Sequence, residues 1–150
     1  MLDNVLKIDQ CEFPITKATF QYDGRKDKPA WWFDIRTKQL ADLPPGSALY
    51  GSEPRLYAEG DPIPLENSKD LTGTEFSLEE PYDPVSGDVY FTLYIHEHGD
   101  VTDLKLKFLK KKGNTYRIHL TAIVPEGLTF STPTELCIDT WIEQLAERKQ

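Results

Sequence analysis

The chain has 150 residues, 39% hydrophobic and 28% charged, which is the balance of one globular domain rather than of a disordered or membrane-embedded chain. Its net charge of −8 disfavours general affinity for nucleic acid or anionic lipid, because an acidic surface repels a polyanion. We therefore expect a single domain over residues 1–150, a basic protein as its partner, and no contact with membranes.

The cellular compartment is indicated by the chain start and the cysteines. Charged Asp3, Lys7 and Asp9 interrupt the apolar residues of the first ten positions, unlike a secretory signal, and no segment is apolar for long enough to span a bilayer. Cys11 and Cys137 lie in no metal or redox spacing. We expect a cytoplasmic protein with two free thiols, and a single bridge between them is the alternative.

The first predicted elements form a hairpin. Residues 30–37 alternate with the two-residue period of a half-buried strand, and residues 15–22 are expected to pair with them. The loop between them begins at Asp23-Gly24, a turn-forming dipeptide. The two predicted faces of the second strand are Trp31, Phe33 and Ile35 toward the core and Trp32, Asp34 and Arg36 toward solvent.

A proline-rich stretch follows. Seven prolines between Pro44 and Pro84 exclude helix there and leave room for short strands, for which residues 55–58 and 74–78 are the candidates.

The strongest strand signal is a three-strand meander over residues 89–124. A tight turn at Gly99-Asp100 would set six apolar side chains on one face, and a loop at 112–114 would add three more. The nine are Phe91, Leu93, Ile95, Leu104, Leu106, Phe108, Ile118, Leu120 and Ala122.

The end of the chain predicts a helix over about 133–148. Thr132-Pro133-Thr134-Glu135 matches a capping box with proline at the first helical position, and an apolar stripe follows at Ile138, Trp141, Ile142 and Leu145. The expected fold class is therefore β-rich α+β: an antiparallel sheet, as part of a sandwich or half-barrel, with this helix packed on it. That outline resembles helix-grip and cystatin-like architectures, which can enclose a ligand cavity.

His96-Glu97-His98 is the sharpest chemical pattern, because alternate strand residues point the same way and two imidazoles could share a metal. With His119 it resembles the zinc ligands of α-type carbonic anhydrases, and a strand-borne HxH also resembles the first cupin motif. The expected register places His119 near Lys107, about 9–10 Å across and about 13 Å along the sheet from His96. The chain is too short for the first family and lacks the glutamate and glycine spacing of the second, so we expect no metal site.

Other catalytic patterns are missing from the sequence. Its serines lie outside G-x-S-x-G contexts, and it has no phosphate-binding glycine loop. Acidic pairs such as Glu79-Glu80 fit no calcium loop. We expect no cofactor and favour a protein that is not an enzyme, although a catalytic cluster of residues distant in the chain stays open.

The expected binding surface centres on Trp32, whose indole beside charged residues suits an interface anchor or a platform for a sugar ring, unless the proline-rich loop covers it. The polar face of the meander combines tyrosines with lysines, a mixture that suits single-stranded nucleic acid but that the acidic remainder opposes. The candidate binding residues are Trp32, Asp34, Arg36, Tyr90, Tyr94 and His96.

These observations favour a non-enzymatic protein-binding module, of the acidic inhibitor, immunity or adaptor type, that engages a basic partner. The alternative is a small-molecule or carbohydrate-binding domain that uses a helix–sheet cavity or an aromatic platform.

Overall fold

The computed structural model describes residues 3–127 and 129–149, and every regular element in them is a strand. The strands are β1 (Val5–Ile8), β2 (Cys11–Tyr22), β3 (Trp31–Thr37), β4 (Arg55–Asp61), β5 (Glu75–Leu78), β6 (Thr92–Tyr94), β7 (His98–Asp100), β8 (Thr102–Lys112), β9 (Thr115–Val124) and β10 (Thr134–Gln144). None of the described residues forms a helix of the length and apolar character needed to cross a membrane.

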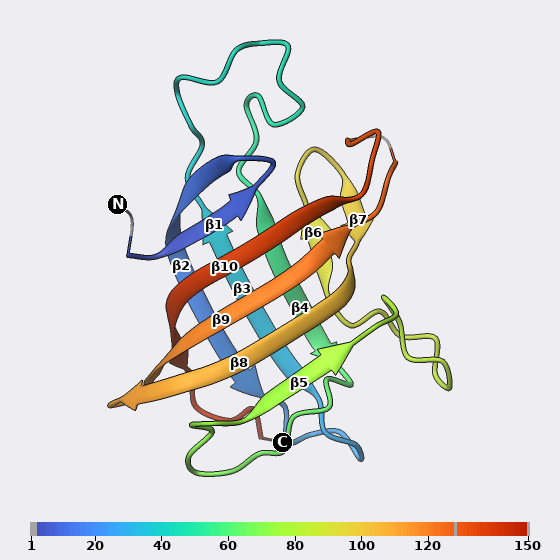
Figure 1. Ribbon diagram of the computed structural model, residues 1–150. Helices are drawn as coiled ribbons and strands as arrows, with labels where there is room; N and C mark the ends of the chain where they lie inside the picture. The colour runs from blue at the N-terminus through green and yellow to red at the C-terminus, as the bar shows by residue number, and fades with distance from the viewer. Residues whose placement is uncertain (1–2, 128, 150) are drawn as a thin grey trace.

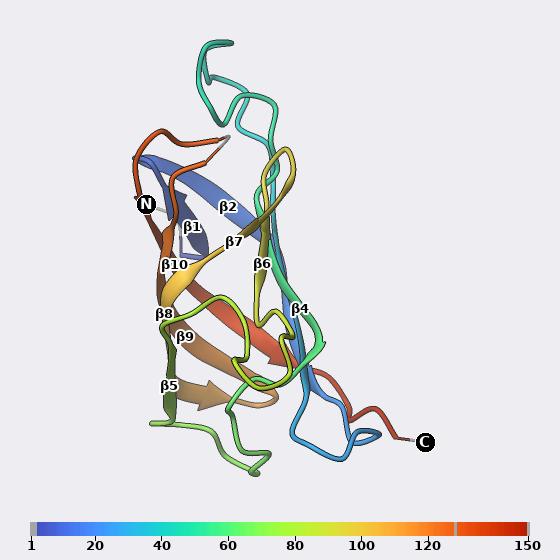
Figure 2. The same ribbon diagram turned by 90° about the vertical axis from the view of Figure 1, so that its right-hand side faces the viewer.

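The ten strands form one sheet in the order β5-β8-β9-β10-β1-β2-β3-β4-β6-β7, with antiparallel neighbours throughout. The sheet doubles over between β10 and β2, so that β5, β8, β9 and β10 cross in front of β2, β3, β4 and β6 (Figure 1). At one end β10 also meets β2 directly, in a short parallel pairing of Glu143 with Thr19. The result is a half-barrel whose two layers are seen edge-on in Figure 2.

An aromatic cluster fills the space between the two layers. The ring of Phe20 in β2 lies 5.7 Å from Trp31 and 5.5 Å from Phe33, both in β3. From the opposite layer Phe108 and Tyr116 approach the same ring at 5.5 and 5.9 Å. All five side chains are fully or almost fully buried, and each contributes roughly 2–3 kcal/mol by leaving water. These side chains therefore fill the interior and hold the two layers together.

Several predicted strands are confirmed. Strands β2 and β3 pair from Tyr22 opposite Trp31 to Ile15 opposite Thr37, and the apolar face of β3 is buried as its alternation predicts. The two short strands of the proline-rich stretch are present as β4 and β5. Strands β8 and β9 also pair in the predicted register, with Leu106 opposite Leu120.

The predicted C-terminal helix over 133–148 is wrong, and so is the α+β fold class that depended on it. Residues 134–144 form β10, which pairs with β9 along ten residue pairs. The buried residues recur every second position: Leu136, Ile138, Thr140 and Ile142. Ile138 and Ile142 are four residues apart, a spacing that fits both a helix face and a strand face. The β-branched residues favour the strand, because their branched side chains pack well on a pleated surface.

The predicted turn at Gly99-Asp100 is wrong as well. Strand β6 instead pairs with β7 through a turn at 95–97, so that Tyr94 lies opposite His98. Strand β6 then pairs with β4 in one layer, while β8 pairs with β5 and β9 in the other. Residues 89–124 therefore do not form one meander, although Leu93 stays buried because the alternation along β6 is unchanged.

Cys11 and Cys137 are free thiols, and both are half-buried. Burial, followed by the carboxylate of Asp139, raises the pKa of the Cys137 thiol to about 11. The expectation of two unbridged cysteines is confirmed.

Candidate functional site

One row of side chains crosses four neighbouring strands, β3, β4, β6 and β7, on the outer face of the layer to which β2, β3 and β4 belong. Arg36 in β3 lies opposite Arg55 in β4, which lies opposite Tyr94 in β6, which lies opposite His98 in β7. The row lines a surface groove of about 500 Å³, to which the turn between β6 and β7 adds His96. Three of the six predicted binding residues, Arg36, Tyr94 and His96, therefore line one groove, and a fourth, Asp34, contacts Arg36 beside it.

A single carboxylate organises the cations of this groove. Asp34 accepts hydrogen bonds from Nε of Arg55 at 2.8 Å and from Nε of Arg36 at 3.0 Å, and Nζ of Lys17 lies 3.4 Å away. Partial burial alone would raise the pKa of Asp34, but the hydrogen bonds from Arg55 and Arg36 outweigh it and lower that pKa. Of the three cations around Asp34, Arg36 and Arg55 line the groove, and Glu53 adds a carboxylate to the same lining.

Aromatic rings form the other side of the groove. The guanidinium of Arg55 lies 4.2 Å from the ring centroid of Tyr57, a cation–π contact. The ring of His98 lies 5.0 Å from Tyr94 and 6.3 Å from Tyr57, edge to face in both pairs. The groove thus offers guanidinium donors beside aromatic faces, a combination that suits a planar or anionic group.

Trp32 lies apart from the groove, and its ring is partly covered. Its Nε1 donates to Asp23 Oδ2 at 3.0 Å, and the guanidinium of Arg148 lies 3.8 Å from the ring centroid. The carboxylate of Asp23 is fully buried, and a paired hydrogen bond from Arg25 is the main reason its pKa lies well below the ordinary value. Arg148, from near the C-terminus, therefore covers the face of the ring, while Gly60 of the proline-rich stretch lies beside its Nε1 edge.

Tyr90 and His119 lie elsewhere again. Tyr90 is half-buried and its backbone N–H donates to Pro81 O at the base of the loop before β6. Burial, followed by the charge of Asp83, raises the pKa of Tyr90. His119 lies on β9 in the other layer, with Lys107 opposite it as the sequence predicts. The three histidines are therefore not gathered into one metal site.

A long acidic stretch that sequence reasoning missed is residues 79–103, named the acidic segment below. It holds seven carboxylates and no lysine or arginine, so it carries −7 of the net −8. It also exposes four large apolar side chains: Tyr82 at 48%, Val85 at 86%, Val89 at 38% and Tyr94, which also lines the groove, at 38%. The absence of any lysine or arginine from residue 70 to residue 104 is the signal that could have found it.

The acidic segment joins the two ends of the sheet. It follows β5, forms β6 and β7, and leads into β8. It therefore runs along the side of the molecule on which the two edge strands, β5 and β7, lie (Figure 2). Its first half is an ordered loop: Tyr82 bridges Val89, and Asp83 N donates to Asp88 O at 2.8 Å. The two halves meet where Asp103 N donates to Glu79 O at 3.0 Å. The carboxylates are therefore presented on a fixed backbone.

A scan against protein-family models found no match to this chain, and searches of curated proteins and of solved structures found none either.

Proposed function

We propose that this protein is a non-enzymatic binding module that engages a basic protein through its acidic segment. The observation that carries the proposal is the concentration of −7 of the net charge in residues 79–103, beside the exposed Tyr82, Val85 and Val89. A cytoplasmic location is part of the proposal, and two unbridged thiols are consistent with it.

Charged side chains and exposed apolar side chains have different roles in such an interface. Clustered carboxylates attract a basic partner at long range and orient its approach, which raises the association rate. Exposed apolar side chains supply the buried contact that holds the complex once formed. Val85 stands in the ordered loop with 86% of its surface exposed, and Asp83 fixes that loop by accepting a hydrogen bond from Val85 N at 2.9 Å.

The groove favours a second candidate function, the binding of a small anionic molecule. Its volume of about 500 Å³ lies in the range of ligand pockets, and Arg36 and Arg55 offer guanidinium donors beside the ring of Tyr94. This candidate keeps the ligand on the outer face, because the space between the layers is filled by core side chains.

Charge-neutralising variants test the proposed function. In the test variant Glu79, Glu80 and Glu97 become Gln and Asp100 becomes Asn. In the control variant four exposed acids outside the segment become amides: Glu12, Asp27, Asp42 and Glu66. Both variants lose four negative charges, so they differ only in where the charge was lost.

The three proteins are immobilised in parallel, and the proteins they retain from source lysate are quantified by mass spectrometry at about 50 and about 500 mM salt. We expect a basic protein to be retained by wild type and the control at low salt, and to be lost from the test variant and at high salt. Equal retention by the test variant and the control would reject the acidic segment as the binding surface.

A further inference from the structure

A second group of chemically reactive side chains lies on the outer face of the other layer. Strand β9 turns Ile118 and Leu120 into the core, so His119 between them faces outward. Strand β10 buries Leu136 and Ile138 in the same way, so Cys137 and Asp139 face outward. Strand alternation thus presents an imidazole, a thiol and a carboxylate on one face.

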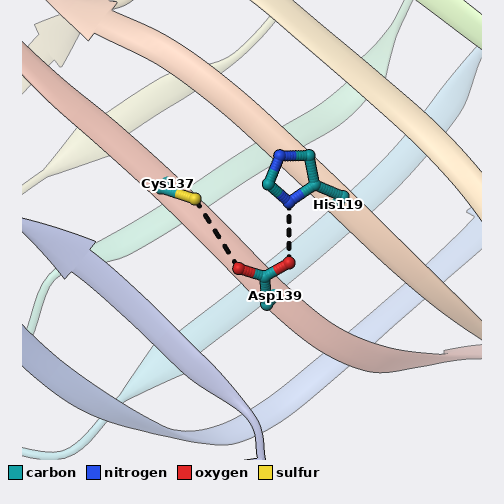
Figure 3. A group of neighbouring side chains, drawn as sticks. All are labelled: His119, Cys137 and Asp139. Carbon is teal, nitrogen blue, oxygen red and sulfur yellow. Dashed lines mark hydrogen bonds and ion pairs between the residues drawn. The ribbon is translucent and has the colours of Figure 1, made fainter.

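The register between the two strands brings these groups together. Asp139 lies directly opposite His119, and Cys137 is two residues away from Asp139 on the same strand. Nδ1 of His119 lies 2.6 Å from Asp139 Oδ1, and Sγ of Cys137 donates to Asp139 Oδ2 at 3.6 Å (Figure 3). One ligand atom from each of the three residues lies within 4.8 Å of the other two.

We propose that His119, Cys137 and Asp139 form a binding site for a divalent transition-metal ion, with Zn²⁺ as the best-fitting ion. Sulfur, imidazole nitrogen and carboxylate oxygen are the three ligand types that zinc takes, with tetrahedral geometry. Bond lengths of 2.0–2.3 Å place the donor atoms of a tetrahedral zinc about 3.3–3.6 Å apart. The pair of His119 and Asp139 would therefore open by about 1 Å, which side-chain rotation on an outer sheet face allows.

The charge of a divalent ion is balanced by the ligands themselves. The thiolate and the carboxylate of a bound site carry −2 together, which one divalent ion neutralises, and coordination sends the thiol proton to solvent. Lys7 lies opposite Cys137 on β1, and Lys107 lies opposite His119 on β8, so each flank of the cluster carries one lysine. Lys107 is paired with Glu75 at 3.7 Å, which reduces its repulsion of an incoming ion.

The site also has room for a fourth ligand. The side chains of His119 and Asp139 are 39% and 40% exposed, so solvent reaches the ligand atoms. Cys137 also lines a surface groove of about 430 Å³ that begins at the turn between β1 and β2. Three protein ligands with water in the fourth position is the arrangement of zinc sites that stay open to a further molecule.

Metal titration of the untagged protein tests the proposal, with Zn²⁺ and Co²⁺ alone as the probes. Zinc affinity is measured by competition with a chromophoric chelator, and Co²⁺ is added to detect the thiolate-to-cobalt charge-transfer absorption. We expect one ion per chain in wild type, and at least about 100-fold weaker binding in Cys137→Ser and His119→Ala. Cys11→Ser and His98→Ala are the matched controls and are expected to bind as wild type does.

Two results would overturn the site. Absence of zinc binding by folded wild type would reject it, and so would zinc binding that survives Cys137→Ser. If that variant does not fold, the cobalt spectrum of wild type decides instead: a charge-transfer band supports thiolate coordination, and a spectrum of aqueous Co²⁺ rejects it. Bound zinc is also expected to raise the melting temperature of wild type and to leave that of His119→Ala unchanged.

Discussion

Arg148 and Trp32 are stacked, with the guanidinium carbon of Arg148 3.8 Å from the centroid of the indole ring. The same arginine donates through Nε to Gln21 Oε1 at 2.8 Å, and its backbone N–H donates to Tyr22 O at 3.0 Å. The end of the chain is therefore tied to β2 and β3, and Trp32 is one of the groups to which it is tied.

This contact predicts that Arg148→Ala uncovers the indole. Loss of a partly desolvated cation–π contact lowers the free energy of unfolding by about 0.5–2 kcal/mol. Quenching of tryptophan fluorescence by iodide is expected to increase in Arg148→Ala and to stay at the wild-type level in Lys149→Ala, since Lys149 is exposed. Equal quenching in the two variants would show that Arg148 does not cover Trp32 in solution.

The buried carboxylate of Asp23 predicts a specific acid sensitivity. Its pKa in the folded chain lies below the unfolded value of about 3.9, chiefly because Arg25 donates a paired hydrogen bond to it. The stability that Asp23 contributes is therefore complete above about pH 4 and is lost as the pH falls through the folded value. Urea unfolding at several acidic pH values is expected to show a shallower acid loss in Asp23→Asn than in wild type.

Asp27→Asn is the control for that experiment, because Asp27 is an exposed acid in the same loop. Its stability is expected to follow the wild-type dependence on pH. If Asp23→Asn loses stability with falling pH as steeply as wild type does, other carboxylates are responsible for the loss of stability in acid.

The position of each residue on β10 gives a test that separates a strand from a helix. Ile142 is fully buried, whereas Leu145 lies beyond the strand and is 39% exposed. We expect Ile142→Ala to lower the free energy of unfolding by about 2–5 kcal/mol and Leu145→Ala to lower it by less than about 1 kcal/mol. The helical stripe would bury both side chains, so comparable losses from both variants in urea unfolding would contradict the strand.

Secondary structure is predicted best from the sequence where the apolar residues fit only one period, that of a strand or that of a helix. In β3 the alternation of Phe33 and Ile35 with charged Asp34 and Arg36 fits a strand and excludes a helix face, and the structure confirms it. In β10 the pair Ile138 and Ile142 fits both the helix period and the strand period, and Pro133 in the capping-box pattern favours a helix. What decides for the strand is the long pairing with β9, a contact between segments that local pattern does not reveal.

The candidate site shows the same division. The sequence pattern predicts a solvent-facing position for Arg36, Tyr94 and His96, and all three line the groove, although His96 does so from the turn between β6 and β7. Arg55 and Tyr57 were missed as ligand-facing residues, because their place depends on the pairing of β4 with both β3 and β6. Residue type and face can be predicted locally, but which faces become neighbours depends on the order of strands in the sheet.

The second candidate function predicts anion binding in the groove. Arg55→Ala and Arg36→Ala are each expected to weaken the binding of inorganic phosphate or glucose 6-phosphate about tenfold, as loss of a charge-assisted hydrogen bond would. Binding is measured by chemical-shift perturbation in NMR spectra, with Lys38→Ala as the control for loss of an exposed cation near the end of β3. Shifts that ignore the groove, or that change equally in the control, would remove this candidate.

Hydrogen–deuterium exchange on the complex with the retained basic protein tests the central claim most directly. The account predicts slower amide exchange over residues 79–103, strongest in the exposed loop around Val85, and unchanged exchange at Trp32 and along β10. Residues 94–98 belong to both the segment and the groove, so residues 79–92 decide between them. Slower exchange confined to the groove or to β10, with residues 79–92 unchanged, would contradict the assignment of the acidic segment as the surface that binds a basic protein.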